Sequence, residues 1–128
     1  MSSEEVKATS ILSALKNFNP FVDMLDLYLN NEGISPARLA EMIHVTPSTI
    51  SQWRSGVRFP KADMVYHIAV ALSLPFDKGE ALIKGWEVAN TIRVSLAYLE
   101  EAFRNEDYRT VISVGERLFL HKKNVQTN

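Results

Sequence analysis

Small polar side chains recur along one side of the segment between residues 46 and 55, and their chemistry is hydrogen bonding. Thr46 stands where a helix N-cap accepts a bond from a backbone N–H, and Pro47 follows at the first helical position, where its missing N–H costs nothing. The side chains that then face outward or half outward are those of Ser48, Thr49, Ser51, Gln52 and Ser55. A helix that is only solvated would more often carry Glu and Lys there. A narrow, polar helix of this kind can enter the major groove of duplex DNA.

Such a helix needs a second helix to hold it, and the sequence predicts one directly before it. Residues 35 to 60 are typical of two short helices joined by a tight turn. Ala40 is small where the two helices would come closest. The apolar residues that a steep crossing would bring together are Leu39, Ala40, Val45, Ile50 and Trp53.

Hydrophobic periodicity is helical nearly throughout the chain, so we expect an all-α fold. Pro20, Gly33 and Pro75 mark expected helix boundaries. Besides the central pair, helices are expected over about 3–17, 20–31, 61–74, 77–104 and 107–121, with frayed residues at 122–128. We therefore predict two domains, residues 1–76 and residues 77–128.

Composition narrows the class of protein. The 128 residues include 46% hydrophobic and 23% charged residues, no cysteine and a net charge of −1, which is typical of one ordinary globular protein. No apolar run approaches the roughly 20 residues that span a bilayer, and Glu4 and Glu5 are atypical of a signal peptide. We expect a cytoplasmic protein without a membrane partner. Near the central pair, residues 35–67 carry four basic residues against two acidic ones.

The central segment resembles the Cro/XRE-type helix-turn-helix family of phage and bacterial repressors. The resemblance covers roughly residues 21–77: residues 34–40 are similar to the family's second helix, 45–53 to its recognition helix, 56–60 to the exit loop and 68–75 to its fourth helix. It implies a lambda-repressor-like five-helix DNA-binding unit, here with an added N-terminal helix and a C-terminal helical pair.

Three residues depart from the family pattern. Pro36 replaces a Gln that often contacts the DNA backbone, and His44 replaces a Gly in the left-handed turn, where histidine is among the enriched alternatives. The family often pairs an Arg of its first helix with a Glu of the recognition helix. Leu29 and Arg54 occupy these places, so we expect that ion pair to be absent.

The resemblance also implies which residues contact DNA. The base-facing positions hold Pro47, Ser48 and Gln52, and Gln52 can both donate to and accept from adenine. The residues expected to position the DNA backbone are Ser35, Thr46, Thr49, Ser51, Arg54, Ser55, Arg58 and Lys61.

The C-terminal region contains a row of apolar residues at helical spacing, and it has two interpretations. The row could pack on the N-terminal helices as ordinary core, or it could form a homodimer, which we favour because family members read two-fold symmetric sites. The dimerisation candidates are Leu82, Trp86, Leu96, Leu99 and Phe103. Residues 88–120 also resemble one tetratricopeptide unit, a single copy of which is weak evidence. A protein or peptide partner at these helices is a further alternative.

Other chemistry has little support. His44, His67 and His121 are scattered without nearby ligands, the glycines stand singly, and we find no pairing of a nucleophile with a base. We therefore expect no catalytic residue, metal or cofactor, and no enzyme. The predicted function is sequence-specific binding of double-stranded DNA by a dimeric, repressor-like transcriptional regulator. The alternative is a protein-interaction module that keeps the helix-turn-helix scaffold without binding DNA.

Overall fold

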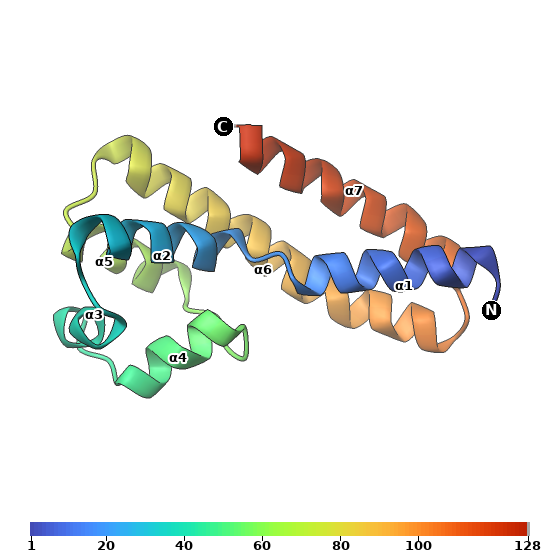
Figure 1. Cartoon of the computed structure of the whole chain (residues 1–128), viewed down its shortest axis with the longest axis horizontal. Helices are drawn as coiled ribbons and strands as arrows, with labels where there is room; N and C mark the ends of the chain where they lie inside the picture. The colour runs from blue at the N-terminus through green and yellow to red at the C-terminus, as the bar shows by residue number, and fades with distance from the viewer. Residues whose placement is uncertain (128) are drawn as a thin grey trace. The chain divides into compact units, whose positions relative to one another are not determined.

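The computed structural model describes the backbone of residues 1–127 and the side chains of residues 1–120. Every regular element in that range is a helix, which confirms the all-α prediction (Figure 1). The helices are α1 (Ser3–Lys16), α2 (Pro20–Glu32), α3 (Pro36–Met42), α4 (Pro47–Ser55), α5 (Ala62–Ala71), α6 (Phe76–Arg104) and α7 (Tyr108–Thr127). The expected fraying from residue 122 is wrong through Thr127, where α7 continues; Asn128 lies outside the described residues.

The chain forms two compact units, and α6 contributes to both. We call Asn19–Glu87 the central unit, and Met1–Phe18 together with the chain from Val88 onward the terminal unit. This division differs from the predicted boundary between residues 76 and 77. The N-terminal helix α1 belongs with the C-terminal helices, and the first part of α6 belongs with α2 to α5.

The terminal unit is held together by an apolar core to which α1, α6 and α7 all contribute. Its buried residues are Ala8, Ile11, Leu12, Leu15, Ile92, Leu99, Ala102, Val111 and Leu118. Within this unit α1 packs against α7. The Tyr108 hydroxyl donates to the Glu5 carboxylate at 2.7 Å, and this hydrogen bond raises the pKa of Tyr108 to about 12.

The central unit buries one side of each of its helices. Its largest fully buried side chains are Phe21, Leu25, Leu39, Ile50, Val65, Ile68 and Leu82. Two hydrogen bonds tie the first part of α6 to the rest of the unit. The Tyr28 hydroxyl donates to the Lys78 carbonyl at 3.3 Å, and Trp86 Nε1 donates to the Pro60 carbonyl at 2.8 Å. These contacts form the scaffold on which α3 and α4 are presented.

Candidate nucleic-acid interface

Local sequence determines where α4 begins and ends. The Thr46 side chain accepts a hydrogen bond from the Thr49 N–H at 3.1 Å, and Pro47 occupies the first turn, as predicted. At the other end Gly56 adopts a left-handed backbone with φ 79°, and its N–H donates to the Trp53 carbonyl. The helix is therefore capped at both ends by its own sequence.

The inner side of α4 is fixed by packing. Ile50 and Trp53 are buried, and Ala40 of α3 is buried as well, which agrees with the predicted close approach of α3 and α4. The turn between the two helices contains His44 with φ 61°, so histidine does take the left-handed conformation expected there. The orientation of α4 relative to α3 is thus set by apolar burial and by one unusual backbone residue.

Several predicted contact residues use their hydroxyl groups within the protein. The Ser35 side chain caps α3 by accepting from the Arg38 N–H at 3.1 Å. Thr46 and Thr49 share a hydrogen bond of 2.9 Å between their hydroxyls, and the Ser55 hydroxyl donates to the Gln52 carbonyl at 3.2 Å. These side chains shape the helix ends, so their first role is local structure.

Other side chains of α4 remain free to bind a ligand. Pro47, Ser48 and Ser51 are exposed and Gln52 is half-buried. Ser48, Ser51 and Gln52 make no side-chain hydrogen bond among the described residues. Their donors and acceptors are therefore available to a partner outside the chain. The accessible residues of α4 therefore include Pro47, Ser48 and Gln52, the three that the resemblance places opposite the bases.

An open hollow of about 360 Å³ lies beside Gln52 within the central unit. Its lining comes from α4, from the loop that follows and from the start of α5, and includes Thr49, Gln52, Arg58, Phe59, Lys61 and Asp63. The hollow combines the neutral amide of Gln52 with the two cations of Arg58 and Lys61 and the one carboxylate of Asp63. The cations outnumber the carboxylate, which suits a ligand with polar edges and negative charge.

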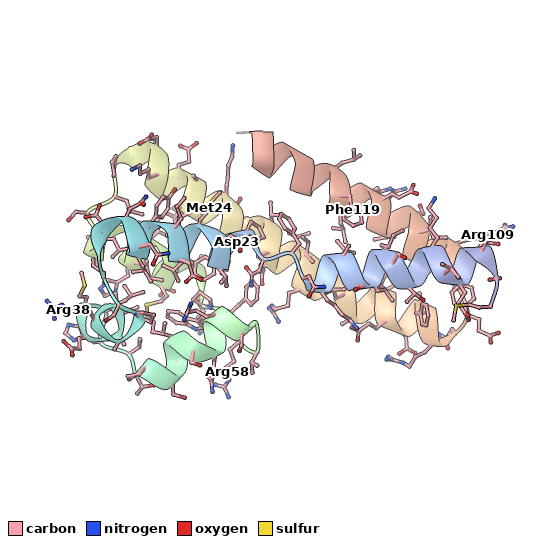
Figure 2. The ribbon with its side chains drawn as sticks, in the orientation of Figure 1. Asp23, Met24, Arg38, Arg58, Arg109 and Phe119 are labelled. Atoms are coloured by element: carbon pink, nitrogen blue, oxygen red, sulfur yellow. The ribbon has the colours of Figure 1, made fainter. Side chains whose placement is uncertain are left out.

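The basic residues around α4 differ in whether they already have an acidic partner. Arg38 pairs with Glu41 at 3.0 Å, and Arg54 pairs with Asp26. Arg58 and Lys61 are exposed and have no ion pair among the described residues. Figure 2 shows Arg38 on α3 and Arg58 in the loop after α4, both at the outer edge of the central unit. The free positive charge therefore lies at the C-terminal end of α4.

Position 29 holds an uncharged Leu, so the family ion pair between positions 29 and 54 does not form, but another ion pair joins α2 to α4. Arg54 Nε donates to Asp26 Oδ1 at 3.0 Å, and Arg54 Nη2 donates to Asp26 Oδ2 at 3.2 Å. The pair joins the same two helices as the family pair, but the acid stands on α2 and the base on α4. Sequence reasoning missed Asp26 because only Leu29 was considered, and Asp26 stands one helical turn before it.

The five dimerisation candidates do not form one exposed surface. Leu82 is wholly buried in the central unit and Leu99 is wholly buried in the terminal unit, so both are core residues. Trp86 is half-buried and its indole N–H donates a hydrogen bond to the Pro60 carbonyl. Leu96 and Phe103 are partly buried and pack against the core of the terminal unit. A side chain buried in its own unit cannot also face a second copy. The apolar row therefore serves two cores, which agrees with the interpretation as ordinary core.

The described residues contain no group of three or more His, Cys, Asp or Glu residues arranged to hold a metal ion; the His121 side chain lies outside them. No helix within the described residues is both long and apolar enough to cross a bilayer.

Comparison with known protein families gives a match to part of the chain. Residues 26–78, under half of the chain, match a family model described as helix-turn-helix. The matched segment lies within the central unit, contains α3, α4 and α5, and begins at Asp26. Searches of curated proteins and of solved structures found no match to the chain.

Proposed function

We propose that this protein is a sequence-specific, repressor-like transcriptional regulator, because residues 26–78 match a helix-turn-helix family model and the same segment resembles the Cro/XRE type of DNA-binding proteins. In this proposal α4 enters the major groove. Gln52 and Ser48 bond to base edges, and Pro47 makes apolar contact with a thymine methyl group. Arg58 and Lys61 bind phosphates next to the groove.

One observation carries the proposal. The side-chain amide of Gln52, which makes no hydrogen bond among the described residues, stands beside Arg58 and Lys61, the two basic residues that have no ion pair there. Base recognition needs the first group and phosphate binding needs the second, and both occur within one hollow. The hydroxyls of Ser35, Thr46, Thr49 and Ser55 are secondary candidates because they already form local bonds.

We further propose that the regulator acts as a dimer in the cytoplasm. Two Arg or Lys side chains on each copy neutralise few phosphates, so a single copy gains little electrostatic affinity for DNA. A dimer doubles the number of contacts and reads two half-sites spaced by about one helical turn.

Selection of bound sequences from a random duplex pool tests this function. We expect an inverted repeat to be enriched at low salt with the full chain. A variant lacking both cations, Arg58→Ala with Lys61→Ala, serves as the control and should enrich no sequence. Failure of the unaltered chain to enrich any motif at low salt would contradict the proposal.

A second candidate is a protein-interaction module that retains the scaffold. The observation in its favour is that two of the four basic residues around α4 are already neutralised, by Glu41 and by Asp26. This candidate requires that no duplex binds at any salt concentration. The same selection experiment therefore separates the two functions.

Removing the Asp26 carboxylate is expected to strengthen DNA binding of every sequence. Asp26→Asn leaves the Arg54 guanidinium without its partner, and a free guanidinium can release one further counterion from DNA. The slope of log K against log salt should therefore steepen by about 0.9. Fluorescence anisotropy with an unrelated duplex at several salt concentrations measures this slope.

Asp23→Asn is the matched control, since it removes an exposed carboxylate from the same helix without freeing an arginine. If both variants steepen the slope equally, the effect comes from net charge alone and the Arg54 interpretation is wrong. Stability should change little, because the side chains of the pair are 43% and 35% exposed and such pairs are worth up to about 1 kcal/mol.

A further inference from the structure

A second hollow of the central unit lies between the end of α5 and the first turns of α6. It is open, has a volume of about 400 Å³ and is lined mainly by apolar side chains. The most exposed of these are Tyr66, Val70 and Phe76, at 55%, 77% and 86%. We call it the α5–α6 hollow. It shares no lining residue with the hollow beside Gln52, so the proposed DNA contacts leave it uncovered.

Backbone hydrogen bonds fix the shape of the α5–α6 hollow. Ser73 takes a left-handed backbone with φ 52° where α5 ends, and its N–H donates to the Val70 carbonyl at 3.0 Å. The Leu74 N–H donates to the Ala69 carbonyl, also at 3.0 Å. Gly79 of α6 is buried next to Ala69, whose Cβ would lie 3.7 Å from a Cβ atom placed at position 79. The walls are therefore in place before a ligand binds.

The α5–α6 hollow carries one negative charge and no positive one. Glu80 is the charged residue of its lining, and it makes no ion pair among the described residues. Lys84 stands one turn after Glu80 on α6 but does not line the hollow. An anion therefore meets no cation in the lining. A neutral apolar ligand would remove water from the Glu80 carboxylate without compensating its charge, which costs free energy.

We propose that the α5–α6 hollow binds a small organic cation, an ammonium group attached to an apolar body. The ammonium group lies against the Glu80 carboxylate, and the rings of Tyr66 and Phe76 supply faces that attract a cation. The apolar body packs on Val70. A metal ion does not fit this lining, because hard cations need several oxygen ligands and the lining supplies one carboxylate.

The size of the hollow favours a small molecule over a protein partner. Its volume of about 400 Å³ lies within the range of roughly 300–1,000 Å³ that is typical of small-molecule sites. Tyr66, Val70 and Phe76 together expose on the order of 400 Å² of apolar surface, about half of the roughly 800 Å² that each protein buries in a standard interface. The surface therefore suffices for one small ligand and is too small for a stable protein interface.

Titration with two probes of the same shape tests the proposal. Benzyltrimethylammonium carries a positive charge, and neopentylbenzene is its neutral isostere. NMR spectra of the full chain labelled with ¹⁵N report binding through the amides of Ser73, Leu74 and Gly79, which line the hollow. We expect benzyltrimethylammonium to shift these three amides in a saturable manner. Absence of such shifts, or shifts confined to other parts of the chain, overturns the proposal.

Glu80→Gln removes the charge of the hollow and keeps the shape of the side chain. It should weaken binding of benzyltrimethylammonium by about two- to fivefold, the range of one exposed ion pair, and should not weaken binding of neopentylbenzene. Glu32→Gln is the matched control, because it removes an exposed carboxylate of the same unit that lies outside the hollow. It should leave both affinities unchanged, and circular dichroism establishes that both variants are folded. Equal effects of the two variants on the cation, or equal weakening of both probes by Glu80→Gln, contradict the role of Glu80 and overturn the proposal. Neither titration contains DNA, so the result is independent of the proposed function.

Discussion

Gln52→Ala is expected to remove most of the preference for the selected operator over a duplex altered at the contacted base pair. A bidentate contact between a glutamine amide and adenine provides about 1–3 kcal/mol of discrimination, which corresponds to roughly 5- to 150-fold. The Gln52 side chain makes no hydrogen bond among the described residues. Its backbone carbonyl accepts hydrogen bonds from the Arg58 N–H and the Ser55 hydroxyl, each at 3.2 Å. The backbone that presents the amide is therefore fixed before DNA binds. Competition between the two duplexes measures the preference.

Affinity for unrelated duplexes should hardly change in this variant, because Arg58 and Lys61 still bind phosphates. Ser51→Ala is the control: Ser51 is exposed on the same helix, has no internal bond and is not among the base-facing residues. It should retain the preference for the operator. A uniform loss of affinity in Gln52→Ala, with discrimination intact, would mean that Gln52 positions the backbone and does not read a base.

Features governed by neighbouring residues could be predicted from the sequence. The Thr46 cap depends on bonds that span three residues, and the left-handed turn at His44 depends on the local backbone, so both predictions were confirmed. The helix-turn-helix resemblance could also be recognised, because its pattern lies within one continuous segment, and the family match confirmed it. Which residues contact DNA stays a prediction.

Features that depend on contacts distant in sequence could not be predicted. Periodicity indicates that Leu82 and Leu99 are buried, but it does not indicate what covers them, and they belong to two different units. The pairing of α1 with α7 has no local signature either. The Asp26–Arg54 pair was missed because the partner of Arg54 was sought only at position 29. An ion pair between two helices can also form from a residue one helical turn away, which here is Asp26.

Gly115→Ala is expected to destabilise the terminal unit by roughly 1–3 kcal/mol, although alanine favours helices over glycine by up to about 1 kcal/mol. A Cβ atom at Gly115 would lie 2.3 Å from Ile11 Cγ2. Because Ile is branched at Cβ and stiff at χ1 in a helix, Ile11 cannot swing this methyl group away. Moving α1 instead would disturb Ala8, Leu12 and Leu15, which share its buried face. The clash therefore outweighs the gain in propensity.

Denaturant unfolding followed by circular dichroism measures this loss, and tryptophan fluorescence localises it. Both tryptophans, Trp53 and Trp86, lie in the central unit, so their transition should shift less than the helical signal. Ser113→Ala, on the exposed side of α7, is the control and should change stability by less than about 0.5 kcal/mol.

A double variant, Ile11→Ala with Gly115→Ala, tests the clash directly. Ile11→Ala alone leaves a cavity, but in the double variant the new Cβ at position 115 partly fills it. The double variant should therefore lose less stability than the sum of the single changes, by about 0.5–3 kcal/mol. Additive losses would show that Gly115 is not required by the close approach of α7 to α1.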